Sequence, residues 1–313
     1  MTRLPSLGLI SHGTSSALGQ SLIEALADAV SGDLRARGLV DEVMLGHVDV
    51  QDPGVEEVID RLPADRPAVL VPLLLSPGYH VHVDLAEALE GAADRDIRLA
   101  PTLGPDPRLA RILAERLPRL RDDDAVVLAA AGSSDARANA SCEEMGRLLA
   151  DELGRTVSVG FLAGGGAPLK AIVEQNRQSG SRLVIANYLL APGFFDDLAR
   201  ALISAADSSA ESVPVAGSGA GEGAVLAPPL LAPGSDAAGL SAANSAESPA
   251  TNRDGSLAPG SDADPGARPE SRDPGSSPES RDLRVTPESR DPRAHAVPAE
   301  LVEIVCDRLI GAL

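Results

Sequence analysis

Short apolar runs alternate with longer stretches of helical period along most of the chain, and this alternation constrains the fold more than any other feature. Leu7–Ile10 predicts a buried strand. In the stretch after it, a leucine or valine recurs every fourth residue from Leu18 to Leu34, which predicts a helix with one buried face. Strands that alternate with helices are typical of βαβ units around a parallel sheet, so we expect an α/β fold.

The order of the expected elements repeats along the chain. Further strands are expected at 43–50, 68–75, 97–99, 125–130, 156–161, 182–190 and 225–227, and further helices at 55–62, 83–92, 109–117, 136–153, 169–178, 195–206 and 299–313. The residues Gly13-Thr14-Ser15 are echoed by Gly132-Ser133-Ser134, and LLSPGYH at Leu74–His80 is echoed by LLAPGFF at Leu189–Phe195. We therefore expect an internal duplication, with chance similarity of apolar strands as the alternative.

A change of composition divides the second half of the chain. From about Ala205 the sequence consists mainly of Ala, Gly, Ser, Pro, Asp and Arg, and PESRD occurs three times at a period of nine residues. Such a segment has too few apolar side chains to offset the entropy of ordering. We predict a domain at 1–120, a second domain formed by 121–232 and 294–313, and a disordered low-complexity insertion at 233–293.

Composition and charge exclude several classes of function. Only 2% of the residues are aromatic, so the cores must consist of Leu, Val, Ile and Ala, and the formal charge of −19 disfavours nucleic acids and anionic membranes as partners. The longest apolar runs fall far short of the roughly 18 to 20 residues that a membrane span requires. The N-terminus lacks the pattern of an export signal, so we expect a cytoplasmic protein. We also expect a monomer. Cys142 and Cys306 are too few for a disulfide framework.

Three polar residues follow neighbouring strands of the first predicted domain. His12 follows the first strand, Asp49 closes the second and His80 follows the third. Ligands of parallel sheets bind at the carboxyl ends of the strands, where these side chains are expected to converge. Two imidazoles and a carboxylate suit a divalent ion such as ferrous iron or cobalt(II).

Each of these residues also has a purely structural interpretation. A single histidine after a strand is more often a loop residue bonded to its neighbours, and Asp49 can start a turn before Pro53. His47 shares a strand face with Asp49, and both His47 and His82 are weaker candidates. The polar loop 13–16 precedes a helix, where it can either bind a carboxylate or simply cap the helix.

The segments His12-Gly13-Thr14 and Pro72–His80, followed by Asp84, resemble the class II chelatases of the sirohydrochlorin chelatase family, of the CbiX and SirB type. Ala100–Leu117 is similar to the closing strand and helix of that family. The resemblance covers about the first 200 residues and, more faintly, the last 20. It implies two similar chelatase-like domains, each a small parallel sheet flanked by helices, that face each other across a tetrapyrrole cleft.

The resemblance also implies an activity, the insertion of cobalt or ferrous iron into sirohydrochlorin during cobalamin or siroheme biosynthesis. The divalent metal is then a substrate, and no organic cofactor is expected. Carried over by position, His12 and His80 would bind the metal and accept protons, and Asp49 would be a third metal ligand. The residues beside the two histidines contact the tetrapyrrole; these are Gly13, Thr14, Gly78 and Tyr79.

The second half departs from this pattern, because Ala131 stands where His12 would and Phe195 where His80 would. We therefore expect the second domain to be degenerate and to serve as a lid or wall. Two other functions remain open from the residues alone. A carrier would bind metal or tetrapyrrole without turning it over, and a histidine phosphatase would need an arginine just before the histidine, where this chain has Ser11.

Overall fold

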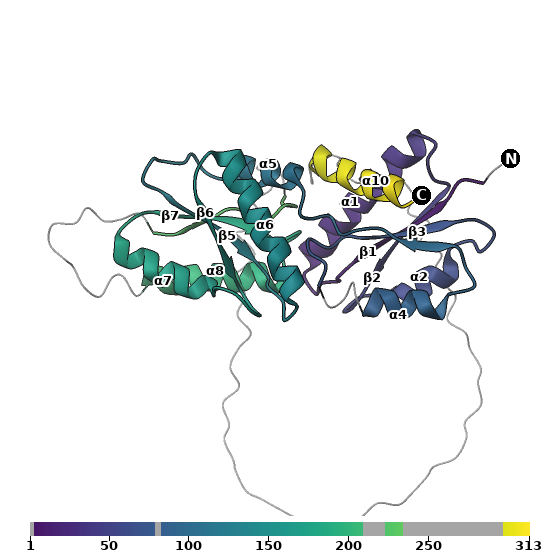
Figure 1. Ribbon diagram of the computed structural model, residues 1–313, viewed down its shortest axis with the longest axis horizontal. Coiled ribbons are helices and arrows are strands. Elements are labelled where there is room, and N and C mark those ends of the chain that lie inside the picture. The colour runs from purple at the N-terminus through teal and green to yellow at the C-terminus, as the bar shows by residue number, and fades with distance from the viewer. Residues whose placement is uncertain (1–2, 79–82, 209–222, 234–296) are drawn as a thin grey trace, which may run out of the picture. The chain divides into compact units, whose positions relative to one another are not determined.

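Two parallel sheets form the framework of the protein (Figure 1). The structure, a computed structural model, describes residues 3–78, 83–208, 223–233 and 297–313. The first sheet has the order β2-β1-β3-β4 and the second the order β6-β5-β7-β8. The strands are β1 (Ser6–Ser11), β2 (Glu42–His47), β3 (Ala68–Pro72), β4 (Ile97–Leu99), β5 (Ala125–Ala130), β6 (Val157–Phe161), β7 (Leu183–Tyr188) and β8 (Val225–Leu226). The predicted α/β fold with two small parallel sheets is confirmed.

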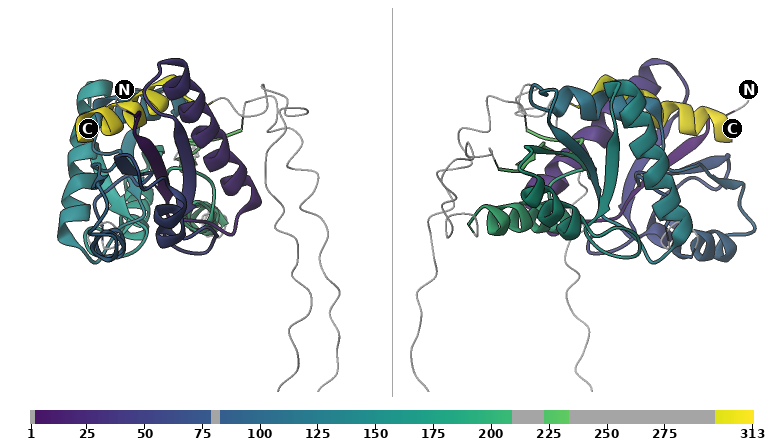
Figure 2. Two further views of the ribbon diagram at one scale, coloured as in Figure 1. Left: turned by 90° about the vertical axis from the view of Figure 1, so that its right-hand side faces the viewer. Right: turned by 60° about the vertical axis from the view of Figure 1, so that its left-hand side comes forward.

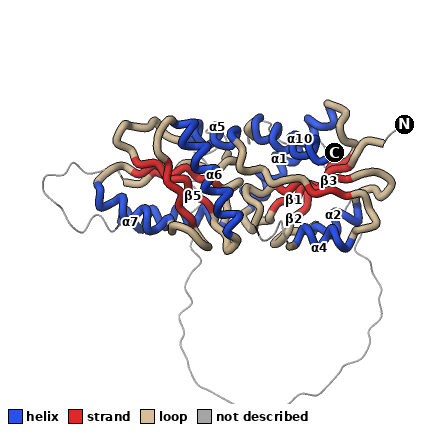
Figure 3. The backbone as a smooth tube through the Cα atoms, in the orientation of Figure 1, coloured by secondary structure: helices blue, strands red, loops and turns tan. Residues whose placement is uncertain are grey.

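Helices cover both faces of each sheet (Figure 3). They are α1 (Ala17–Ala36), α2 (Val55–Arg61), α4 (Asp84–Gly91), α5 (Pro107–Arg116), α6 (Ala136–Leu153), α7 (Leu169–Ser179), α8 (Phe194–Ser208) and α10 (Ala299–Ala312). Alternate residues of a strand face opposite cores, as in β1, where Leu7 and Leu9 pack in the core with α1 and α10. Ile10 packs in the core with α2 and α4. Burial on both faces explains why the inner strands β3 and β5 are apolar throughout.

The first helix shows how the sequence specifies its elements. Its leucine and valine stripe is fully buried from Leu22 to Leu34, whereas Leu18 is 37% exposed, so the buried face begins one turn later than predicted. Ser16 is the N-cap, and its side chain accepts a hydrogen bond from the Gly19 backbone N–H. Capping and periodicity together account for a helix of 20 residues directly after β1.

The duplication expected from the sequence is present in the topology. β1 pairs with β2 and β3 in parallel, and β5 pairs with β6 and β7 in the same way. In register, Ser11 lies opposite His47 in the first sheet, and Ala130 lies opposite Phe161 in the second. The loops that follow β1 and β5 therefore occupy equivalent places in the two sheets.

The last helix packs differently from the expectation that it completes the second domain. α10 contacts α1, β3 and α5, whereas α5 contacts α6 and β7 of the second half. Figure 2 shows α10 (yellow) beside α1 (purple) in both views. The Arg308 guanidinium fixes α10 by donating to the backbone oxygens of Thr102 at 2.8 Å and Leu103 at 2.9 Å. An apolar stripe predicts that a helix face is buried but not which sheet covers it, so the sequence alone did not indicate this packing.

Two sequence expectations reach beyond the described part of the chain. The predicted insertion at 233–293 falls outside it, apart from residue 233, and the domain boundaries drawn from the sequence stay predictions. Of the helices that the structure describes, none has the length and apolar character of a membrane span.

Candidate functional site

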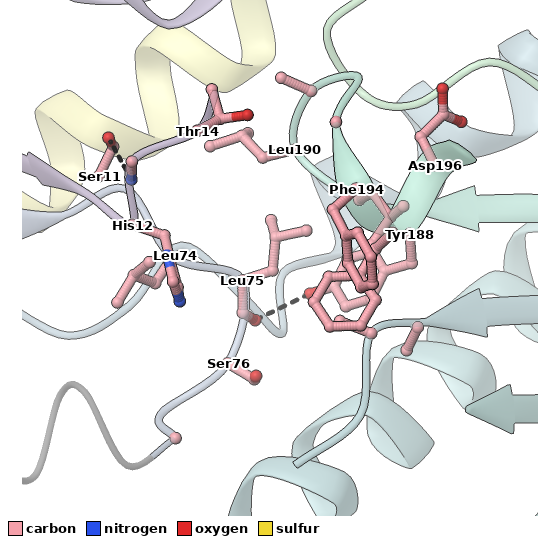
Figure 4. Close-up of a pocket in the computed structure, with 18 of the residues that line it drawn as sticks. Ser11, His12, Thr14, Leu74, Leu75, Ser76, Tyr188, Leu190, Phe194 and Asp196 are labelled. Carbon is pink, nitrogen blue, oxygen red and sulfur yellow. Dashed lines mark hydrogen bonds between the residues drawn. The ribbon is translucent and has the colours of Figure 1, made fainter. Parts of the chain in front are cut away.

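A cavity of about 620 Å³ lies at the carboxyl ends of β1, β3, β5 and β7 (Figure 4). Four loops contribute most of its lining, at 11–15, 73–78, 130–134 and 188–196. The volume is within the range of small-molecule sites, and the position is the usual one for ligands of parallel sheets. The two halves of the duplication therefore both supply walls of the candidate site.

A glycine turn with the same geometry follows both β1 and β5. Gly13 has a φ of 94° and Gly132 a φ of 86°, a region that disfavours residues with a side chain. A Cβ at Gly13 would lie 1.8 Å from the Asp49 carbonyl oxygen, so no larger residue fits there. The turn presents His12 at the cavity in the first half and Ala131 in the second.

His12 has an exposed side chain that lines the cavity. In Figure 4 its ring lies next to Leu74, on the opposite side of the pocket from Phe194. The backbone oxygen of His12 accepts a hydrogen bond from the Asp49 N–H at 2.9 Å, which fixes the start of the loop. His12 is thus an accessible imidazole on a constrained backbone.

The loop that follows His12 leads into the N-terminus of α1, and several of its backbone N–H groups donate hydrogen bonds to side chains of the protein. The Gly13 N–H donates to the Ser11 hydroxyl, and the Thr14 N–H donates to Gln51 Oε1 at 2.9 Å. The Ser16 N–H donates to the Thr14 hydroxyl at 3.1 Å. These bonds favour the capping interpretation over a carboxylate site. Sequence reasoning missed the contribution of Gln51.

Neither polar residue of the predicted second strand, His47 or Asp49, is in the described lining of the cavity. Asp49 is exposed, and its carboxylate accepts a hydrogen bond from the neighbouring Val50 N–H at 2.8 Å. Val50 lines the cavity, but Asp49 is not in the described lining, so its role as a metal ligand stays a prediction. His47 is buried and bonds to the Ser11 hydroxyl at 2.7 Å; burial lowers the pKa of its imidazole. It is a satisfied core histidine.

The second predicted histidine cannot be placed. His80, Tyr79 and His82 lie outside the described residues, whereas Gly78 lines the cavity. The structure thus brings together four predicted site residues: His12, Gly13, Thr14 and Gly78. Among the side chains that the structure describes, no three His, Cys, Asp or Glu residues form a metal-binding group.

Reciprocal contacts hold the loops around the cavity. A Cβ at Gly193 would lie 3.0 Å from the Thr14 hydroxyl, and one at Gly78 would lie 3.6 Å from the Ser133 hydroxyl, so each Pro-Gly loop lies close to the glycine turn of the other half. The Tyr188 hydroxyl donates to the Leu75 carbonyl oxygen at 3.0 Å, and burial holds the pKa of this phenol well above its usual range. Sequence reasoning missed Tyr188, because an aromatic residue at a strand end is usually a core residue.

The cavity is largely apolar. Of the described side chains that line it, none belongs to Arg or Lys. The carboxylate of Asp196 is 3% exposed and accepts hydrogen bonds from Asn187 Nδ2 at 2.8 Å and from Arg200 Nε at 2.9 Å. This lining gives no support to a histidine phosphatase, which would need arginines for the phosphoryl group.

Comparison with known proteins identifies the family. The family model CbiX matches residues 6–120 and 125–217, so the two matched segments contain β1–β4 and β5–β7. The chain belongs to the CbiX family. The resemblance seen at His12-Gly13-Thr14 and at Pro72–His80 is thereby confirmed.

Individual proteins are also similar to this chain. The sirohydrochlorin cobaltochelatase of Sulfurisphaera tokodaii is 31% identical over 83 residues, which cover 26% of this chain and 69% of that protein. The structure of SirB from Bacillus subtilis with Fe³⁺ gives a TM-score of 0.59 at 18% identity, over 73% of this chain and 88% of that one. The structure of DR2241 from Deinococcus radiodurans gives a TM-score of 0.54 at 23% identity, over 72% of this chain and 51% of that one. At these identities the structural matches show the shared fold.

Proposed function

We propose that this protein inserts a divalent metal ion, Co²⁺ or Fe²⁺, into sirohydrochlorin. The observation that carries the proposal is the position of His12, which lines a cavity of about 620 Å³ in a chain of the CbiX family. The Sulfurisphaera tokodaii relative is a sirohydrochlorin cobaltochelatase, and structures of SirB from Bacillus subtilis contain Fe³⁺ in one case and cobalt in another. Both metals are therefore candidate substrates.

The chemistry of the reaction explains why histidines suit it. Insertion removes two pyrrole N–H protons and passes the metal from weak protein ligands to four ring nitrogens. Neutral imidazole binds such ions and accepts protons near neutral pH, so it can perform either task. We propose that His12 and His80 share these two tasks and that Asp49 orients or neutralises the site. The residues next to the histidines, Gly13, Thr14, Gly78 and Tyr79, would then contact the tetrapyrrole.

A spectrophotometric assay tests the proposal. Sirohydrochlorin is mixed with Co²⁺ or Fe²⁺, and the rate of the spectral change is compared for wild type, His12→Ala and His80→Ala. General acid–base groups contribute about 10²- to 10⁴-fold to a rate, so we expect losses of at least about 100-fold in either variant. His295→Ala is a matched control, because the sequence assigns that histidine no role, and it should keep the wild-type rate.

The same assay separates a chelatase from a carrier. If wild type metallates sirohydrochlorin no faster than the uncatalysed reaction, while still binding it, the protein is a carrier and the proposal is wrong. The ratio of kcat/KM for Co²⁺ to that for Fe²⁺ measures the metal preference, and with it the choice between cobalamin and siroheme biosynthesis.

We also propose that 233–293 is a passive insertion, since its recurring PESRD motif contains no large apolar side chain that a core could bury. A variant without these residues should keep the kcat and KM of the full chain. A deletion variant that folds but loses activity would contradict this part of the proposal.

A further inference from the structure

Aromatic side chains are rare in this chain and gather at the cavity. The 313 residues include three Phe, two Tyr and no Trp. Tyr188, Phe194 and Phe195 all line the cavity. Tyr188 is buried and bonded to Leu75, as described above, but the side chain of Phe194 is 73% exposed. A large exposed aromatic ring at a cavity indicates a surface that a ligand covers.

The two phenylalanines form a pair at the start of α8. Their ring centroids are 5.4 Å apart and the rings are inclined at 73°, an edge-to-face arrangement. Phe195 thereby supports Phe194 from the side, since such pairs are mutually attractive. In Figure 4 the Phe194 ring lies across the pocket from His12.

The remaining lining decides which part of a substrate this pair can contact. Leucines dominate the neighbouring loops, at 73–75 and 189–190, and the one acidic group of the described lining, Asp196, is engaged by Asn187 and Arg200. No Arg or Lys lines the cavity among the described residues, so this part of the wall offers a polycarboxylate no basic side chain. It can hold the apolar, conjugated faces of a flat ring, with its carboxylates directed outward.

We propose that Phe194, supported by Phe195, forms an aromatic face on which the tetrapyrrole macrocycle stacks opposite His12. This inference rests on the proposed function and assigns a task to the second half. In the duplication Phe195 stands where His80 stands in the first half, so an apolar phenyl ring takes the place of a polar imidazole. The first half then supplies the imidazole chemistry, and the second half holds the ring.

Substitutions at Phe194 test the aromatic face. The variants are Phe194→Ala, Phe194→Leu and Phe194→Tyr. An absorbance titration measures the dissociation constant Kd of metal-free sirohydrochlorin, and an assay of Co²⁺ insertion measures kcat and the KM for sirohydrochlorin. We expect Phe194→Ala to raise Kd and KM about tenfold with kcat within about twofold of wild type, because stacking acts on ground state and transition state alike. Phe194→Tyr should restore both constants, whereas Phe194→Leu should restore them only in part.

Ile310→Ala is the matched control, since Ile310 is 44% exposed on α10 and does not line the cavity; it should leave Kd and KM unchanged. Wild-type Kd and KM in Phe194→Ala would overturn the inference, and full restoration by Phe194→Leu would overturn its aromatic character. If wild type metallates sirohydrochlorin and Phe194→Ala is indistinguishable from it, only this inference fails. If wild type binds no sirohydrochlorin, the proposed function fails with it.

Discussion

The glycine turn that presents His12 makes a quantitative prediction. Replacing Gly13 by Ala places a methyl group where the Asp49 carbonyl oxygen lies, at a distance of 1.8 Å. The backbone around His12 and Asp49 must then move apart, and the hydrogen bond from the Asp49 N–H to the His12 oxygen is lost or weakened. The perturbation therefore acts on both the stability of the protein and the position of the imidazole.

The magnitude follows from two contributions. A positive φ costs a residue with a Cβ about 1–2 kcal/mol, and forcing a methyl group into an occupied space costs about 1–3 kcal/mol more. We therefore expect Gly13→Ala to lower the free energy of unfolding by about 2–5 kcal/mol. Gly38 is a matched control, because its φ is 65° but a Cβ there would meet nothing within 4 Å. Gly38→Ala should lower the free energy of unfolding only by the cost of the positive φ, about 1–2 kcal/mol.

Urea denaturation of the two variants measures both losses under identical conditions. The rate of Co²⁺ insertion should also fall in Gly13→Ala and stay at the wild-type value in Gly38→Ala, since only the first change displaces His12. Equal destabilisation by the two substitutions would refute the reasoning, because it would show that the contact with Asp49 has no energetic consequence.

Two further predictions concern contacts between segments distant in sequence. Tyr188→Phe should lower the free energy of unfolding by about 1–2 kcal/mol in urea denaturation, because the Leu75 oxygen loses its donor; a loss below about 0.3 kcal/mol would contradict this. Burial of Asp106 opposes its ionisation, but hydrogen bonds from Arg108 outweigh burial and, with the charge of Arg308, lower the pKa of the carboxyl group. Wild type should therefore have a higher free energy of unfolding than Asp106→Asn, by a constant amount above about pH 4, and this difference should disappear as the pH falls through the lowered pKa. A difference in the free energy of unfolding that does not change with pH would contradict the prediction.

Local patterns predicted most of the individual elements. The bounds expected for β4, β5 and α6 agree with the structure, because burial on both faces of a strand and on one face of a helix leaves a clear period in the sequence. β2 is shorter than predicted, since it ends at His47 rather than Val50. The chain turns there, and Val50 has a φ of 67°, a conformation that apolar character does not reveal.

The sequence did not predict which elements pack together when they are distant along the chain. The apolar stripe of α10 predicted a buried face, but a stripe of Leu, Ile and Val fits any apolar sheet, so its packing on α1 and β3 was not predictable. Position after a strand made His12 a candidate, and His12 lines the cavity, but its role stays a prediction. The same criterion could not reveal Phe194 and Tyr188, although the LLAPGFF echo and the rarity of aromatic residues were signals for them.

A crystal structure of the protein with metal-free sirohydrochlorin bound would test the central claim most directly. The account predicts a macrocycle inside the cavity, with the imidazole of His12 directed at the pyrrole nitrogens of one face, at about 2.6–3.2 Å or through one water. The Phe194 ring should cover the other face. A macrocycle bound elsewhere on the molecule, or in the cavity with His12 directed away from its nitrogens, would contradict the account.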